Sequence, residues 1–114
     1  MKKNPTVYLN EMIESIERIA DYIKDMSFSS FEKNFAIQDA VLRRLQLMAE
    51  AAKRVDEVTK QKNADIPWKK INGLRNTITH EYDEIDLQSI WDTATIDLPP
   101  LKSQIKKLRN IIGQ

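Results

Sequence analysis

The sequence predicts an all-α protein, a four- to five-helix up-and-down bundle that forms one domain over residues 1–114. Apolar residues recur at intervals of three and four along most of the chain, which is the period of an amphipathic helix. The sequence has only two glycines and four prolines, so little of it is available for long loops. Hydrophobic residues make up 41% of the sequence and charged residues 31%, which is typical of a globular domain with its own core.

The first helix is expected to begin at Asn4-Pro5 and to run to about Asp25. Proline is favoured at a first helical position, because the N–H that it lacks has no partner there in any helix. The apolar positions of this helix are Leu9, Met12, Ile13, Ile16, Ile19, Ala20 and Ile23. A turn over residues 26–30 should follow.

The second helix is expected to begin at a capping box, in which Ser29 is followed three residues later by Glu32. Its apolar positions are Phe31 and Phe35 on one face, and then Val41, Leu45, Met48, Ala52 and Val55. This pattern predicts a long helix that reaches about Thr59, with an irregularity near Asn34. Residues 60–65 are polar and should connect it to the next helix.

The third helix should start at residues 66–68, with Pro67 in its first turn. Its apolar positions are Ile71, Leu74 and Ile78. Gly73 lies inside it and costs about 1 kcal/mol relative to alanine. A glycine at such a position often marks the close approach of another backbone or of a ligand. We expect the helix to end near Tyr82 or Asp83.

Asp86 should cap the last helical segment. The apolar positions of that segment are Leu87, Trp91, Ala94, Leu98, Leu101, Ile105, Leu108 and Ile112. The alternating spacing of four and three is unbroken, so both halves of the segment should face the same core. Pro99 and Pro100 remove two backbone donors and should kink or break the helix there, which would give five helices instead of four.

Several kinds of site are excluded by composition. The absence of cysteine excludes disulfides, thiolate metal sites and a cysteine nucleophile. With a single histidine, neither a metal site nor a cofactor is expected. No apolar run approaches the roughly 18 residues that a membrane span needs. Lys2 and Lys3 precede a polar residue instead of a signal segment, so we expect a cytoplasmic protein that does not contact membranes.

Charge is unevenly distributed although the net charge is only +1. Residues 60–75 carry four lysines and one arginine against a single acidic residue, Asp65. Residues 81–97 carry six acidic residues and no basic one, and residues 98–114 carry four basic residues and no acidic one. A basic surface can hold an RNA backbone. Solvated helix faces are the more common explanation of any single cluster.

The only histidine, His80, follows Arg75 and Asn76 and precedes Tyr82. Histidine titrates near neutral pH, and the planar fork of arginine can clamp a phosphate. At 100° per residue, Asn76 and His80 share one side of a helix while Arg75 flanks them. Two copies related by a two-fold axis could bring both sets into one groove, and Gly73 would let the helices approach. His80 could instead serve only as a favourable charge at a helix C-terminus, beside acidic residues that cap helices.

A resemblance extends this interpretation. The motifs that carry it are Pro67-Trp68, Gly73-Leu74-Arg75-Asn76 and His80-Glu81-Tyr82. Together they resemble the HEPN superfamily, and in particular the HepT-like toxins of HepT–MntA modules. Residues 47–51 occupy the place of a glycine-containing family element, with Ala49 in place of the glycine, and Trp91 and Leu98-Pro99 also match. The resemblance implies a metal-independent endoribonuclease toxin, neutralised by a MntA-like nucleotidyltransferase antitoxin.

The resemblance also implies roles for the site residues. His80 would act as general acid or base, Arg75 would stabilise charge on the phosphoryl oxygens, and Asn76 would orient His80 or the phosphate. Tyr82 would be adenylylated by the antitoxin. The protein would be a homodimer that acts on RNA and does not require DNA. The alternative is a non-catalytic helical module that docks a nucleotidyltransferase; a third interpretation is a structural helical dimer.

Overall fold

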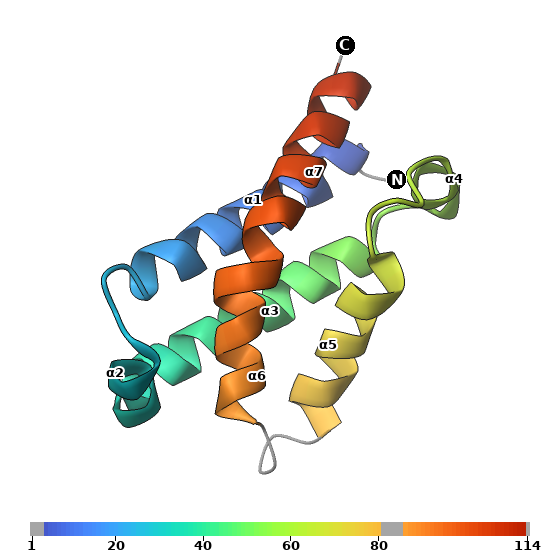
Figure 1. The fold of residues 1–114 in the computed structure, drawn as a ribbon. Helices are drawn as coiled ribbons and strands as arrows, with labels where there is room; N and C mark the ends of the chain where they lie inside the picture. The colour runs from blue at the N-terminus through green and yellow to red at the C-terminus, as the bar shows by residue number, and fades with distance from the viewer. Residues whose placement is uncertain (1–3, 81–85, 114) are drawn as a thin grey trace.

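The computed structural model describes residues 4–80 and 86–113, with only the backbone described for residues 75–80. Its elements are α1 (Pro5–Tyr22), α2 (Phe28–Lys33), α3 (Phe35–Lys53), α4 (Glu57–Lys62), α5 (Trp68–His80), α6 (Leu87–Asp92), the π-helical turn η2 (Thr93–Asp97) and α7 (Leu98–Ile112) (Figure 1). Every element in these two described ranges is helical. The predicted all-α fold is therefore confirmed.

The long helices form the bundle, and each runs opposite to the one before it (Figure 1). α1 packs against both α3 and α7, whereas α5 packs mainly against α3. The continuous run α6–η2–α7 forms the fourth rod, while α2 and α4 are short helices between the long ones. Among the described helices, none is both long enough and apolar enough to cross a bilayer.

The core lies where α1, α3 and α7 meet. Its largest fully buried side chains are Phe31, Leu9, Met12, Ile19, Leu45, Met48, Leu98, Ile105 and Val41. They come from the apolar stripes that the 3–4 spacing predicted. Ala49, where the family element has a glycine, is also fully buried in α3. Ala20 is an exception to the predicted stripe, because its side chain is exposed.

α1 begins where the sequence predicted and ends earlier. The side-chain oxygen of Asn4 accepts a hydrogen bond from the Thr6 backbone N–H at 2.9 Å, which caps the first turn. The helix ends at Tyr22 and not at Asp25. Asp25 has a φ of +62°, the left-handed conformation that commonly follows a helix C-terminus.

The capping box predicted at Ser29 is wrong. The hydroxyl of Ser27 is the cap of α2, and it accepts a hydrogen bond from the Ser30 N–H at 3.1 Å. Ser29 lies inside the helix. The earlier start brings Phe28 into the helix, where its ring meets Trp91 edge-on at a centroid distance of 6.2 Å.

The irregularity predicted near Asn34 is confirmed as a complete break between α2 and α3. Asn34 is extended (φ −109°, ψ 91°), and its side chain accepts a hydrogen bond from the Ile37 N–H at 3.0 Å. Phe31 is 1% exposed and Phe35 is 75% exposed, so the prediction that they share one buried face is wrong. The break disrupts the register on which that prediction depended. Buried Gln38 donates to the backbone carbonyl of Phe31 at 2.9 Å and so satisfies the end of α2.

The second long helix is also shorter than predicted. α3 ends at Lys53 and not near Thr59. Asp56 then starts α4, because its carboxylate accepts a hydrogen bond from the Thr59 N–H at 3.1 Å. Residues 60–62 are therefore helical, and only residues 63–67 connect α4 to α5. Val55 is buried in the turn between α3 and α4, which explains why the apolar pattern continues past the end of the helix.

In the last rod, Asp86 caps α6 as predicted, but the irregularity lies before Pro99 and Pro100 and not at them. The Asp86 carboxylate accepts a hydrogen bond from the Gln88 N–H at 3.0 Å. The rod departs from α-helical geometry in η2, before the prolines, where the Leu98 N–H donates to the carbonyl of Thr93, five residues earlier. Pro99 and Pro100 lie in the first turn of α7. All eight predicted apolar positions of the rod pack in or against the core.

Candidate functional site

The residues singled out as catalytic lie on one helix. α5 runs without interruption from Trp68 to His80 and so includes Arg75 and Asn76. In its backbone register, positions 76 and 80 are four residues apart and fall close to one side of the helix, with position 75 to the flank. The side chains of these residues, and Tyr82 as a whole, lie outside the described part of the chain. Their chemical roles therefore stay predictions.

Trp68 fixes the start of α5 against α4. Its indole Nε1 donates to the backbone carbonyl of Asn63 at 3.1 Å, and the Asn63 side chain donates to the carbonyl of Thr59 at 2.8 Å. The ammonium of Lys60 lies 5.8 Å from the centre of the indole ring, within cation–π range. Ile71 is buried one turn further along α5. Trp68 therefore anchors the start of α5 to the end of α4.

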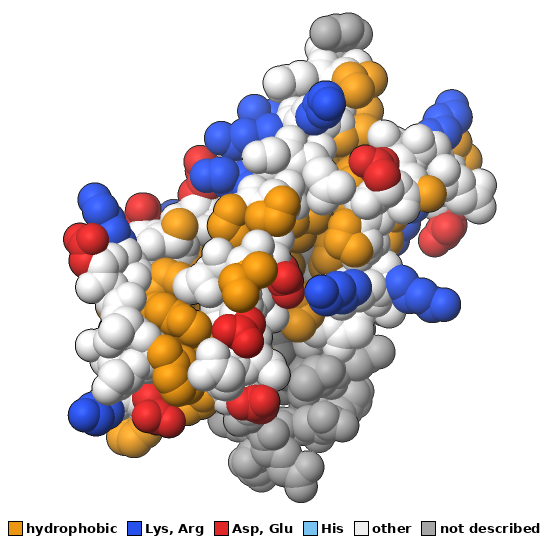
Figure 2. Space-filling view, viewed as in Figure 1, with side chains coloured by type: hydrophobic (Ala, Val, Ile, Leu, Met, Phe, Trp, Pro, Cys, Tyr) orange, Lys and Arg blue, Asp and Glu red, His pale blue; other side chains and the backbone are white. Residues whose placement is uncertain are grey.

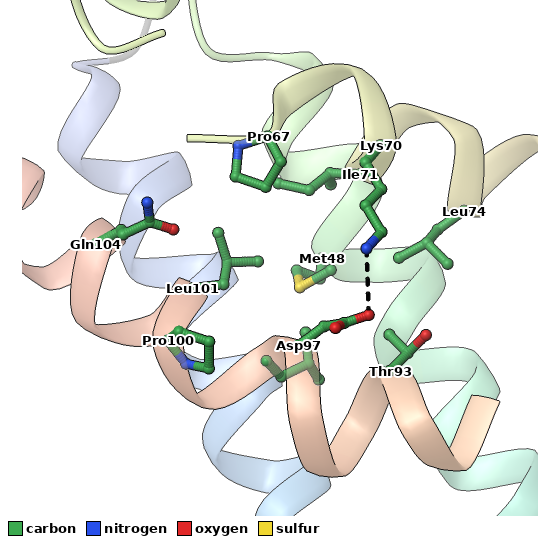
Figure 3. Close-up of a pocket in the computed structure, with 11 residues that line it drawn as sticks. Met48, Pro67, Lys70, Ile71, Leu74, Thr93, Asp97, Pro100, Leu101 and Gln104 are labelled. Atoms are coloured by element: carbon green, nitrogen blue, oxygen red, sulfur yellow. Dashed lines mark hydrogen bonds and ion pairs between the residues drawn. The ribbon is translucent and has the colours of Figure 1, made fainter. Parts of the chain in front are cut away.

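A small apolar pocket lies between α5 and the last rod (Figure 3). It has a volume of about 210 Å³ and is lined by Met48, Pro67, Lys70, Ile71, Leu74, Thr93, Asp97, Leu98, Pro100, Leu101 and Gln104. The Lys70 ammonium reaches across the gap to the carboxylate of Asp97 in η2 at 3.4 Å (Figure 3). Because the two charges pair with each other, this pocket offers an apolar surface and no free acid or base.

A wider groove lies beside the first turns of α5. We call it the α4–α5 groove; its volume is about 810 Å³. The lining includes Lys53, Glu57, Lys60, Lys69 and Asn72. The basic cluster predicted over residues 60–75 therefore contributes two of the three lysines here. Lys53 was missed because it ends α3, and only the hairpin turn into α4 brings it to this place.

Gly73 lies on the exposed surface of α5. A Cβ built at this position would have no atom of the described residues within 4 Å, apart from its chain neighbours and the nearby backbone of α5 itself. Within one chain, then, no described element makes the close approach that the sequence predicted for this glycine. The approach of a second copy stays a prediction.

Within residues 4–80 and 86–113, no group of three or more histidine, cysteine, aspartate or glutamate side chains lies close enough together to hold a metal ion. The side chain of His80 and the acidic residues at positions 81, 83 and 84 lie outside the described part of the chain. The expectation of a metal-free protein therefore stays a prediction.

Comparisons with known proteins agree on one family. A family model described as "Ribonuclease HepT-like" matches residues 12–108. A "Probable ribonuclease HepT" from Thermococcus cleftensis is 32% identical over 109 residues, which cover 96% of this chain and 99% of that protein. A "Putative RNase" from Caldanaerobacter subterraneus subsp. tengcongensis is 31% identical over 106 residues, which cover 93% of this chain and 95% of that protein.

One further relative is longer. A "Gamma-glutamylcyclotransferase and putative RNase" from Methanocaldococcus jannaschii is 36% identical over 108 residues, or 95% of this chain. Those residues make up 49% of that protein, so the chain spans about half the length of this relative. No solved structure matches the chain.

Proposed function

Because the chain belongs to the ribonuclease HepT-like family, we propose that it is a metal-independent endoribonuclease whose catalytic centre lies on α5. The observation that carries the proposal is the position of Arg75, Asn76 and His80 on one unbroken helix, inside the range that the family model matches. The names of the relatives add RNA as the substrate class.

These residue types suffice for cleavage by internal transesterification. His80 accepts the proton of the RNA 2′-hydroxyl while that oxygen attacks the adjacent phosphorus. The bond from phosphorus to the 5′-oxygen breaks, and that oxygen takes a proton from a general acid. The products are a 2′,3′-cyclic phosphate and a 5′-hydroxyl. Arg75 stabilises the charge that grows on the phosphoryl oxygens, and Asn76 orients His80 or the phosphate. DNA is spared because it lacks the 2′-hydroxyl.

A second copy of the chain would complete this centre. The reaction needs both a base and an acid, and each chain supplies one histidine. A two-fold axis beside α5 would bring His80 and Arg75 of both copies to one groove. The exposed position of Gly73 on α5 supports this arrangement.

Regulation by a nucleotidyltransferase antitoxin belongs to the same proposal, with Tyr82 as the adenylylated residue. An AMP group there would add bulk and a negative charge two residues after His80, which would repel the RNA backbone. The test is AMP incorporation by the partner enzyme into the wild type and into Tyr82→Phe. Loss of incorporation in the variant is expected. An unchanged yield would show that the modified residue lies elsewhere.

The proposed nuclease is tested by RNA cleavage in EDTA with purified wild type, His80→Ala and Arg75→Ala. We expect the wild type to leave cyclic-phosphate ends. Loss of the general base or acid should slow cleavage roughly 10²- to 10⁴-fold. Circular dichroism and thermal unfolding control for the fold. Wild-type rates in both variants, or cleavage that stops in EDTA, would overturn the proposal. No cleavage by protein shown by mass spectrometry to be unmodified would favour the docking module.

A further inference from the structure

The α4–α5 groove is a positively charged surface with an aromatic floor. Its lysines come from three helices: Lys53 ends α3, Lys60 lies on α4, and Lys69 lies in the first turn of α5. Glu57 is the one acidic residue in the lining, which also includes Trp68 and buried Ile66. Figure 2 shows Lys and Arg side chains over both α4 and α5 on the same side of the molecule.

The three groove lysines have no carboxylate partner within ion-pair distance among the described residues, although the Lys60 ammonium lies over the Trp68 ring. Ion pairs in the described ranges join Arg18 to Glu14, Lys70 to Asp97 and Lys106 to Glu17. None of the groove lysines forms an ion pair within these ranges. Unpaired lysines that surround a groove attract a phosphate backbone, because each bound phosphate releases a condensed counterion from the nucleic acid.

Trp68 gives the groove a surface on which a base can stack. The indole is half-buried, and its Nε1 is already occupied by the carbonyl of Asn63. That hydrogen bond holds the ring in one orientation at the base of the groove. Aromatic side chains between cationic ones are the usual way in which proteins hold single-stranded nucleic acid without reading its sequence.

The groove residues on α5 also lie on the same side of that helix as the proposed catalytic centre. Lys69 and Asn72 line the groove, and positions 76 and 80 follow them along α5. Positions 69, 72, 76 and 80 are three, four and four residues apart, so they lie within about 80° of one another around the helix. Asn72 and position 80 are separated by eight residues, or about 12 Å along the axis. A strand that leaves the groove along this side of α5 reaches His80.

We infer that the α4–α5 groove binds the single-stranded RNA that flanks the cleaved phosphate. Lys53, Lys60 and Lys69 contact successive phosphates, and a base stacks on Trp68 in the place that the Lys60 ammonium occupies without RNA. The inference rests on the proposed function, which supplies the class of ligand. An acidic protein segment would also be attracted by the charge, but it would not use the indole or the register with position 80.

The first test measures RNA binding with a matched charge control. Lys53→Gln/Lys60→Gln/Lys69→Gln is compared with Lys24→Gln/Lys33→Gln/Lys107→Gln, which removes three exposed lysines from other elements. Both are made in a His80→Ala background, and the probe is a fluorescein-labelled 12-nucleotide single-stranded RNA. At 0.1 M salt each lost phosphate contact weakens binding roughly 5-fold, so the groove variant should bind roughly 100-fold more weakly. The slope of log affinity against log salt should fall by about 2.

The control variant should bind nearly as tightly as its parent. Equal weakening of the two variants would overturn the inference, since total charge would then account for binding. Unchanged binding by the groove variant would overturn it as well, and so would an absence of RNA binding by the parent protein.

The second test uses Trp68 as a reporter. Trp91→Phe leaves Trp68 as the single tryptophan, and the same RNA should quench its fluorescence at saturation. Trp68→Phe, which keeps Trp91, should show no quenching. Unaltered Trp68 fluorescence under saturating RNA would exclude the stacked base.

Cleavage kinetics separate this inference from the proposed function. The groove variant should raise KM roughly 100-fold and leave kcat within a few-fold, since the lysines contact phosphates that do not react. A wild type that binds RNA through the groove but does not cleave it would refute the nuclease and keep the groove. A wild type that cleaves RNA, with an unchanged KM in the groove variant, would refute the groove and keep the nuclease.

Discussion

α1 and α5 differ in how much of each helix the rest of the chain covers. α1 lies between α3 and α7, and its buried residues are Leu9, Met12, Ile13, Ser15, Ile16 and Ile19. α5 packs mainly against α3 (Figure 1), and among its side chains at positions 68–74 only Ile71 is buried. One helix therefore serves the core, while most of the described side chains of the other, at positions 68–74, lie outside it.

The first prediction compares one leucine from each region. Leu45, at the centre of the core on α3, is fully buried, and Leu74 on α5 is half-buried. Leu45→Ala should lower the free energy of unfolding by roughly 2–5 kcal/mol, because it removes buried methyl groups and leaves a cavity. Leu74→Ala should cost about 1 kcal/mol, since water can fill the space. Denaturant unfolding measures both, and equal losses would contradict the proposed difference between the regions.

The second prediction concerns the boundary between α2 and α3 at Asn34. Asn34→Ala removes the side chain that caps α3 and should cost about 1 kcal/mol of unfolding free energy. Asn110→Ala is the matched control, because Asn110 is exposed in the interior of α7 and caps nothing. The control should be neutral or slightly stabilising, since alanine has the higher helix propensity. If the two variants were equally stable, the break between α2 and α3 would not depend on its cap.

The smallest effect is expected for the ion pair that links α5 to the last rod. Lys70 and Asp97 lie 3.4 Å apart with both side chains well exposed to solvent. A double-mutant cycle with Lys70→Ala and Asp97→Ala should give a coupling of roughly 0.2–1 kcal/mol that weakens with added salt. A coupling well above that range would mean that α5 is fastened to the bundle more firmly than its sparse burial indicates.

The sequence predicted helices best where a local signal and the apolar pattern agreed. Asn4-Pro5 and Asp86 were found because each precedes an amphipathic stretch with its own cap. The end of α3 was missed because the apolar pattern continues through Val55, which is buried by the fold without being helical. Ser27 and Ser29 can both cap a helix, and a start at Ser27 places Phe28 in α2 against Trp91, a contact that the local sequence does not reveal.

The sequence predicted the position of the irregularity in the last rod only approximately. A proline ring clashes with the carbonyl four residues before it, so Pro99 and Pro100 act on Thr95 and Ile96. Both of those residues lie in η2. The prolines thus predicted the existence of the irregularity, while its position follows from the direction in which the ring acts.

Part of the candidate site was also predicted from the sequence, and part of it was not. The placement of Arg75, Asn76 and His80 on one helix followed from periodicity alone. The groove could not be found from the sequence, because Lys53 and Lys69 lie 16 positions apart and meet only through the folding of α4. Its local signals were the basic cluster and the tryptophan inside it.

η2 has a consequence for how the length of this chain can change. A π-helical turn closes its hydrogen bonds over five residues where an α-helix uses four, so it holds one extra residue in the same rod. Deletion of one residue there would let the rod continue as α-helix with α6 and α7 in nearly their present orientations. The same deletion within α3 would turn the following half of its apolar stripe by about 100° away from the core. Among the described long helices, the last rod is therefore the one that can lose a residue at the least cost.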